Sequence, residues 1–459
     1  MYNIPKILSD QKAFFESQKT KEVSFRLSLL KKLKSEIISN EKDIMDALYK
    51  DFKKSKFETF LSEYALVKSS LSLTIKNLKK WSKPKRIWPS ILTFPSSDYI
   101  YKEPYGNVLI IAPWNYPFLL ALEPLVMAVA AGNTVVLKPS ELTSNTSKIL
   151  TKIISNTFPK EYVKTVEGGV EVSTELLAQK WDYIFFTGST KVGKIVAEAA
   201  AKNLTPITLE LGGKSPCIID DTVDLTLVTK RLVWGKFLNG GQTCIAPDYI
   251  IAKSEIKEQL INALKSEIIR SYGENPKKSP DLARIIDKKN TIRLQGLIEN
   301  ETVVFGGDID ENDHYISPTI VDEPKLDSGI MSEEIFGPLL PILTYNAFED
   351  IENIVSYNKN PLSLYVFSNN KRFVKNCIEK FSFGGGVIND LLIQFGNHRL
   401  PFGGVGASGM GRYHGKHGFD TFTHHKPIIK RGNWMDPPFR YAPYKGKLGI
   451  LKKLFKYFG

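Results

Sequence analysis

Residues 106–141 read GNVLIIAPWNYPFLLALEPLVMAVAAGNTVVLKPSE. Two short apolar runs, 107–112 and 134–137, flank a longer apolar segment at 118–131 that has the length of a helix. Parallel strands need a crossover connection, which is usually a helix, so strand, helix and strand in this order form a parallel βαβ unit. The stretch therefore predicts an α/β fold built on a parallel sheet.

The same alternation continues on both sides of this stretch. Residues 6–80 have apolar positions at helical spacing, and a region rich in proline follows, with a strand expected at 98–102. Near the other end, 419–425 also alternates like a strand. Further strands are expected at 163–167, 183–186, 216–219, 249–252, 302–305, 340–345, 363–368 and 386–389.

Length and charge narrow the class of protein. A chain of 459 residues is long enough for about three domains of ordinary size. Its formal net charge of +13 could indicate a nucleic-acid partner, but residues 426–459 hold nine basic residues and one acid. Most of the excess positive charge therefore lies in this tail, and residues 1–425 carry little of it. A folded body with so little excess charge does not favour binding along a phosphate backbone, so we expect no nucleic-acid partner.

The cysteines are few and lack metal-binding spacing. Cys217, Cys244 and Cys377 form no CxxC pair, which predicts a reducing compartment, here the cytoplasm, and no metal site. The N-terminus lacks the apolar core of a signal peptide. The apolar stretch 118–131 is too short to span a bilayer.

Three side chains are candidates for catalysis. Cys244 follows Gly240 and Gly241, which could expose its thiol next to backbone N–H groups, although a lone cysteine is more often a buried apolar residue. Glu210 follows a strand and could serve as a general base, or be an ion-paired surface carboxylate. Asn115 lies between two prolines and could donate to an oxyanion, or cap its own turn.

Two strand-to-helix turns are candidates for anion or ribose binding. Gly188 and Ser189 follow the strand at 183–186 and precede a helix, whose N-terminus favours an anion, but the turn lacks the GxGxxG pattern and could need glycine only for its geometry. Lys138 and Glu141 follow the strand at 134–137, where ribose hydroxyls could bind. A solvated charged turn is an equal alternative.

Seven motifs occur in order along the chain: PWNYP, KPSE, FTGS, LELGGK, GGQTC, EEIFGP and LPFGGVGASGMGRYHG. Together they resemble the NAD(P)-dependent aldehyde dehydrogenase superfamily, and their spacing resembles its class 3 branch, which acts on fatty and aromatic aldehydes. The resemblance covers about residues 5–425. It implies that Cys244 is the nucleophile, that Asn115 and the Cys244 N–H hold the oxyanion, and that Glu210 activates the deacylating water.

The resemblance also implies a dinucleotide site. Lys138 and Glu141 would bind the adenine ribose, while Glu334 and Phe336 would lie at the nicotinamide ribose and ring. Gly188 and Ser189 would lie near the pyrophosphate. A carboxylate near the 2′-hydroxyl would repel a 2′-phosphate, so we expect NAD to be preferred, with NADP as a second cofactor.

The substrate and product are predicted on the same basis. Trp234 and Phe402 are candidates for an apolar tunnel that favours long-chain, isoprenoid or aromatic aldehydes, although either could be core packing. Relatives that transfer the acyl group to coenzyme A typically lack the glutamate at 210, so the expected product is the free carboxylic acid. A CoA-acylating enzyme is the alternative.

The predicted domains follow from these assignments. A Rossmann-type cofactor domain comprises 1–80 and 105–209, and an α/β catalytic domain comprises 210–395. A small β bridging element, 81–104 with 396–425, would pair across a homodimer, and 426–459 form a basic tail. Residues 448–459 place apolar residues on one helical face and lysines on the other, as a peripheral membrane helix or a solvated helix would.

Overall fold

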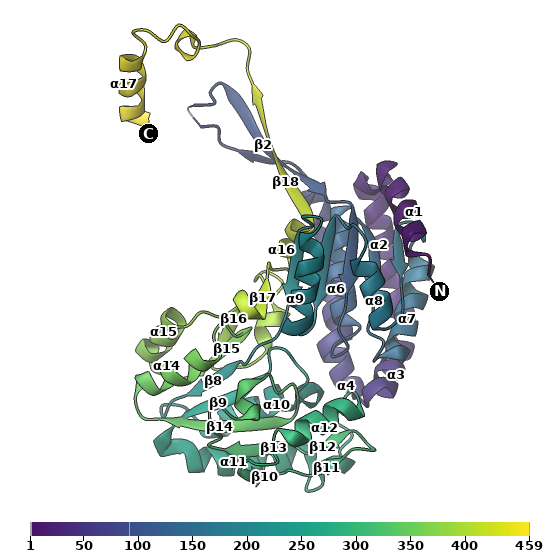
Figure 1. Cartoon of the computed structure of the whole chain (residues 1–459), viewed down its shortest axis with the longest axis vertical. Coiled ribbons are helices and arrows are strands. Elements are labelled where there is room, and N and C mark those ends of the chain that lie inside the picture. The colour runs from purple at the N-terminus through teal and green to yellow at the C-terminus, as the bar shows by residue number, and fades with distance from the viewer. Residues whose placement is uncertain (1, 91, 459) are drawn as a thin grey trace.

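The computed structural model describes residues 2–90 and 92–458 (Figure 1). Two sheet-containing bodies lie next to each other, and a narrow arm of β-strands extends away from them (Figure 1). The segment 6–80, predicted to be helical, forms a series of helices that packs on the first body. Its helices are α1 (Ile4–Glu16), α2 (Val23–Ser39), α3 (Glu41–Phe52), α4 (Lys56–Thr59) and α5 (Ala65–Trp81), with a π-helical turn, η2 (Phe60–Tyr64), between the last two.

The first body contains a six-stranded sheet, and its parallel strands confirm the βαβ prediction. The strands, in spatial order, are β17 (Gly409–Met410), β7 (Ile207–Glu210), β6 (Tyr183–Thr187), β3 (Asn107–Ile111), β4 (Thr134–Lys138) and β5 (Val163–Thr165). All neighbouring pairs are parallel except β17 with β7. The crossover helices are α6 (Leu119–Ala131), α7 (Ser144–Thr157), α8 (Val170–Leu177) and α9 (Thr190–Ala201).

Both faces of this sheet are buried, because successive side chains of a strand point to opposite faces. Val108 and Ile110 of β3 pack with α2, α5, α6 and α7, whereas Leu109 and Ile111 pack with α1, α8 and α9. Helix α6 is buried along its whole length, which explains why its sequence is apolar on all sides except at Glu123.

The second body contains a seven-stranded sheet. Its strands, in spatial order, are β10 (Val303–Phe305), β13 (Thr319–Asp322), β14 (Leu339–Tyr345), β9 (Tyr249–Lys253), β8 (Pro216–Ile219), β15 (Ser363–Phe367) and β16 (Gly385–Ile388). All pairs except β10 with β13 are parallel. Its helices are α10 (Leu225–Phe237), α11 (Lys257–Tyr272), α12 (Lys288–Gly296), α13 (Gly329–Ser332), α14 (Phe348–Tyr357) and α15 (Lys371–Lys380), and a small ribbon pairs β11 (Ile309–Asp310) with β12 (Tyr315–Ile316).

The arm is a three-stranded antiparallel sheet of β1 (Lys85–Ile87), β2 (Ser96–Pro104) and β18 (Thr423–Arg431). The chain then leads to a terminal helix, α17 (Leu448–Phe458), which lies beyond the arm and away from the two bodies (Figure 1). Within the described chain, every helix is too short or too polar to cross a membrane.

One sequence expectation near the arm is wrong. The alternating stretch 419–425 was expected to be a strand, but its first part belongs to helix α16 (Gly415–Thr421) and β18 begins only at Thr423. The reason is a close approach to α6: a Cβ added at Gly418 would lie 2.8 Å from Cγ of Met127. Packing between two helices here outweighs the local alternation. The domain boundaries stay a prediction, and β18 continues past residue 425.

Candidate active site

The strand order of the first sheet brings several predicted residues to one edge. The chain runs from β3 through β4 to β5 on one side and then returns to β6 and β7 on the other side of β3. Ligands of such sheets bind beyond the carboxyl ends of the strands, at the point where the order reverses. Asn115 follows β3 there, Ser189 follows β6, and Glu210 is the last residue of β7.

The loop that carries Cys244 needs its glycines. Asn239 and Gly240 have φ of 58° and 64°, and Gly241 has φ of 75°. A Cβ at Gly241 would lie 2.3 Å from the carbonyl oxygen of Gly337, in the EEIFGP motif. Glycine is therefore required at 241 both for the backbone conformation and for the close approach of two loops.

Cys244 opens onto a cavity of about 210 Å³. Glu210, Trp234 and Phe402 line the same cavity, so the structure brings together four of the predicted residues. Cys244 is partly accessible, whereas Cys217 and Cys377 are buried in the cores of the second body. Most of the remaining wall is apolar, including Leu61, Leu66, Leu119, Leu120, Leu238, Ile245, Leu392, Ile393, Phe395 and Tyr413.

Burial affects the protonation of both reactive groups. Burial raises the pKa of the Glu210 carboxyl well above its usual range, and within residues 2–90 and 92–458 neither carboxylate oxygen of Glu210 has a hydrogen-bond partner. Burial, with the nearby Glu334 and Glu210 carboxyls, also raises the pKa of the Cys244 thiol. A raised pKa suits a carboxyl that must exchange a proton with water near neutral pH.

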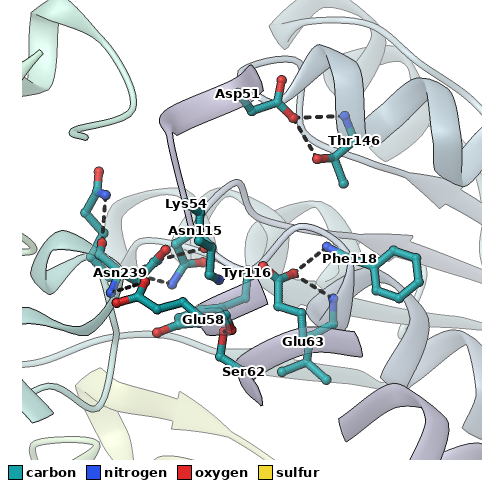
Figure 2. A network of polar contacts seen from close by, with 12 residues as sticks. Asp51, Lys54, Glu58, Ser62, Glu63, Asn115, Tyr116, Phe118, Thr146 and Asn239 are labelled. Atoms are coloured by element: carbon teal, nitrogen blue, oxygen red, sulfur yellow. Dashed lines mark hydrogen bonds and ion pairs between the residues drawn. The ribbon is translucent and has the colours of Figure 1, made fainter. Parts of the chain in front are cut away.

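Asn115 is fixed to the loop that carries Cys244. Its side-chain Nδ2 donates to the carbonyl oxygen of Gln242 at 3.0 Å, and the Nδ2 of Asn239 donates to the Asn115 carbonyl oxygen at 2.9 Å (Figure 2). The Tyr116 hydroxyl is 2.5 Å from Oγ1 of Thr243. Because an amide nitrogen has two hydrogens, Asn115 retains one donor after bonding Gln242.

The residues predicted for the adenosine half of a dinucleotide lie along the first sheet. Lys138 is buried, and its Nζ is 2.5 Å from Oε2 of the exposed Glu141. Ser189 caps α9, since its Oγ accepts from the Val192 N–H at 3.4 Å. A cation and a carboxylate at the end of β4, with a helix N-terminus after β6 on the other side of β3, form a donor and acceptor set that fits a ribose and a pyrophosphate.

Glu334 and Phe336, the residues predicted for the nicotinamide half, come from the second body and contact the segments that follow β7 and β3. A Cβ at Gly212, in the LELGGK motif, would lie 2.0 Å from Oε2 of Glu334, so any other residue there would displace this carboxylate. Burial, reinforced by Asp248, raises the pKa of Glu334 to about 8. Phe336 packs edge-on against Trp114, with ring centroids 5.3 Å apart. The residues present therefore fit a nicotinamide dinucleotide.

Comparison with known proteins agrees with this geometry. Residues 3–428 match the sequence profile described as the aldehyde dehydrogenase family. The chain belongs to the aldehyde dehydrogenase family. It is 48% identical over 449 residues to 4,4'-diaponeurosporen-aldehyde dehydrogenase of Staphylococcus aureus, with 97% of this chain and 98% of that protein covered. It is 43% identical to aldehyde dehydrogenase family 3 member A2 of Pongo abelii, with 96% and 93% covered.

Solved structures place this aldehyde dehydrogenase in the same fold. A structure described as the substrate-bound state of Staphylococcus aureus AldH matches with a TM-score of 0.97 at 47% identity, covering 99% of this chain and 100% of that one. The NAD-dependent aldehyde dehydrogenase from Sinorhizobium meliloti matches with a TM-score of 0.85 at 26% identity, covering 95% and 88%. The predicted fold class and enzyme class are confirmed. These relatives lend no support to the CoA-acylating and nucleic-acid alternatives.

Sequence analysis of this aldehyde dehydrogenase missed one cluster with metal-binding side chains. Glu123, His398 and His414 place one ligand atom each within 4.8 Å of one another. However, His414 Nε2 and Glu123 Oε1 are 3.9 Å apart, whereas donors around a tetrahedral zinc are roughly 3.3 Å apart. We therefore assign no metal here. Local spacing could not have revealed the cluster, because Glu123 lies more than two hundred residues before the two histidines.

Sequence analysis also missed the charged residues behind the Asn115 loop. Lys54, Glu58 and Glu63 are buried and contact the segments that carry Asn115 and Cys244. Charged residues are rarely buried, so a helical sequence such as 54–63 predicts solvent-facing charges. Only the three-dimensional arrangement shows their placement.

Proposed function

We propose that this aldehyde dehydrogenase oxidises long-chain, isoprenoid or aromatic aldehydes to carboxylic acids. The observation that carries this proposal is the largely apolar wall of the cavity onto which Cys244 opens. Such a wall favours apolar substrates over short polar ones. The name of the Staphylococcus aureus relative, 4,4'-diaponeurosporen-aldehyde dehydrogenase, agrees with this substrate class.

Cys244 is the proposed nucleophile. Its sulfur adds to the aldehyde carbon and forms a thiohemiacetal. The remaining Asn115 N–H and the Cys244 backbone N–H would hold the developing oxyanion, and one well-aimed donor of this kind contributes about 3 kcal/mol to the transition state. When bound, oxidised NAD(P) supplies the acceptor for the hydride that leaves the aldehyde carbon. The acyl group then remains on Cys244 as a thioester.

Glu210 is the proposed base for release of the acid. It would take a proton from water as the water attacks the thioester carbonyl, and the thiol of Cys244 would be regenerated with a free carboxylic acid as product. Its carboxylate oxygens, both unpaired within the described structure, are available to a water molecule in the cavity. This placement supports hydrolysis over transfer to coenzyme A.

The proposed cofactor is NAD, with NADP as a second choice. Lys138 and Glu141 would hold the adenine ribose, Gly188 and Ser189 would lie near the pyrophosphate, and Glu334 would bind the nicotinamide ribose next to Phe336. Glu141 disfavours a 2′-phosphate, and its ion pair with Lys138 reduces that repulsion.

The assembly and location are also proposals. The arm projects from the two bodies and exposes apolar side chains such as Ile428 and Ile429, which favours pairing with a second copy of the chain. We propose a cytoplasmic homodimer with peripheral membrane contact through α17, where Leu448, Ile450 and Phe455 are exposed near three lysines. The sequence also predicts Leu454 and Phe458 on the apolar face of this helix, but the structure describes only their backbone.

The test of this proposal is NADH production across aldehydes from propanal to long polyene aldehydes. The expected result is a kcat/KM that rises with apolar chain length, with no turnover by Cys244→Ala. Mass spectrometry of the wild-type enzyme during turnover should show an acylated peptide that contains Cys244. Equal rates across the series would contradict the apolar site, and undiminished turnover by Cys244→Ala would contradict the nucleophile.

A further inference from the structure

A short segment behind the active site connects the cavity to buried charges. It consists of the loop after α3, helix α4 and the π-helical turn η2, which together span residues 53–64. Leu61 and Ser62 of this segment line the cavity, while Lys54 and Glu63 are not among the lining residues and are fully buried. π-helical turns often occur at functional sites.

Lys54 and Glu63 form an ion pair without exposed surface. Nζ of Lys54 is 2.7 Å from Oε1 of Glu63, and both side chains are 0% exposed. The same ammonium lies 4.1 Å from the centre of the Tyr116 ring. Two favourable contacts to one buried cation, one ionic and one with an aromatic face, fix its position. Tyr116 directly follows Asn115, so the cation supports the segment that carries the proposed oxyanion donor.

The second oxygen of Glu63 fixes the other side of that segment. Oε2 of Glu63 accepts from the backbone N–H groups of Phe118, at 2.9 Å, and Leu119, at 3.1 Å (Figure 2). These are the first amides of α6, which otherwise lack a helical partner and carry positive partial charge. Glu63 therefore holds the start of α6, three residues after Asn115.

A parallel contact holds the loop of the nucleophile. Oε2 of Glu58 accepts from the backbone N–H of Asn239 at 3.1 Å (Figure 2). Asn239 has a left-handed backbone, and its side chain bonds the carbonyl oxygens of Asn115 and Gln242. The carboxylates of one short segment thus contact both loops that meet at the cavity.

We infer that Lys54 and Glu63 are positioning residues that aim the Asn115 amide at the oxyanion. This inference rests on the roles proposed above for Asn115 and Cys244. An ion pair that only stabilised the fold could lie anywhere in the core, but this one contacts both Tyr116 and the start of α6. The directional contacts on either side of Asn115 leave its amide little freedom, which is the property that an oxyanion donor needs.

The test is a double-mutant cycle on the first, acylating turnover. The variants are Glu63→Gln, which removes the charge and keeps the shape, and Asn115→Ala, alone and together. The readout is the rate constant of the NADH burst at saturating NAD, with the NADH dissociation constant measured separately by fluorescence. Removing an oxyanion donor typically lowers a rate by 10²–10³-fold, so displacing the donor should cost about tenfold to a hundredfold.

The expected result is a strongly non-additive cycle. Glu63→Gln should slow the burst at least about tenfold in the wild-type background and less than about threefold in the Asn115→Ala background, with the NADH dissociation constant unchanged. A burst within twofold of wild type would overturn the inference, as would the same loss in both backgrounds. If Asn115→Ala itself has no effect, the proposed oxyanion role fails and the inference fails with it; if only Asn115→Ala slows the burst, the inference alone fails.

Two further variants separate positioning from stability. Asp51→Asn is the matched control, because Asp51 accepts from the Asn145 and Thr146 N–H groups at the start of α7 and does not contact the Asn115 segment (Figure 2). It should lower the melting temperature and leave the burst within twofold. Where Glu63→Gln does not fold, Lys54→Met/Glu63→Gln replaces it, since this pair leaves no unpaired buried ammonium. Failure of both variants to fold would mark the pair as structural and overturn the inference.

Discussion

Replacing Glu210 with glutamine separates the two halves of the proposed reaction. The amide matches the carboxyl in shape, and no hydrogen bond of Glu210 within the described structure is lost, because both carboxylate oxygens lack a partner there. The fold should therefore tolerate the change. The variant cannot take a proton from water, so the acyl thioester on Cys244 should form and then persist.

The magnitude follows from the role of the carboxyl. A positioned general base contributes about 10²–10⁴-fold, so the steady-state rate of Glu210→Gln should fall by that factor. The first turnover should remain within about threefold, giving a burst of one NADH per chain. The wild-type steady-state rate should rise with pH as the carboxyl ionises, over a range well above the usual pKa of glutamate because burial raises the pKa of Glu210. The variant should lose that rise.

The assay is stopped-flow absorbance of NADH, followed by intact-mass measurement of the quenched enzyme. Glu123→Gln is a matched control, since Glu123 is another buried carboxyl without a hydrogen-bond partner in the described structure, and it does not line the cavity. A steady-state rate within twofold of wild type would refute the role of Glu210. A burst slowed as much as the steady state would place Glu210 before hydride release and contradict the assignment to deacylation.

Three further outcomes are expected. Burial raises the pKa of Glu123 from 4.5 to about 7, so the stability of the wild-type enzyme should decline as pH rises from about 4.5 to 7. In urea titrations, Glu123→Gln should therefore raise the free energy of unfolding by up to about 3 kcal/mol at pH 8 and by little at pH 5. Equal gains at both pH values would contradict this role of Glu123. Trp234→Ala should lower kcat/KM about tenfold for long-chain aldehydes and less than twofold for propanal. Truncation after Pro443 should abolish co-sedimentation with anionic vesicles, and equal binding by the intact and truncated chains would exclude the tail as an anchor.

The sequence predicted elements whose signal is local. Strands β3 and β4 and helix α6 were predictable because a continuous apolar pattern of the right length needs burial on both sides. The unusual backbone conformation of the loop before Cys244 was predictable, because paired glycines indicate a conformation that other residues rarely adopt. The structure shows positive φ there. The place of Trp234 and Phe402 in the cavity wall agrees with their expected role, although their function stays a prediction.

Features that depend on distant contacts were not predictable. Helix α16 replaces an expected strand because Gly418 packs against Met127, and nothing near Gly418 in the sequence announces α6 as a neighbour. Lys54 and Glu63 lie in a sequence that resembles an exposed helix, and they pair with each other. The Tyr116 ring and the Phe118 N–H that also contact them come from a segment more than fifty residues later. Burial of charge is invisible in a single sequence whenever the compensating groups come from elsewhere in the fold.

The wall of the cavity is largely apolar, whereas hydrogen bonds hold the loops that carry Asn115 and Cys244. Glu210 comes from the first sheet and Cys244 from a loop of the second body, so the relative position of the two bodies sets the distance between these two side chains. Apolar packing gives cohesion without direction, whereas hydrogen bonds such as Asn115 to Gln242 and Asn239 to Asn115 restrict both distance and angle. A substrate wall can tolerate variation in shape, but an oxyanion donor misplaced by 1 Å loses much of its effect. We therefore expect the apolar residues to fit the substrate and the buried polar residues behind them to fit the transition state.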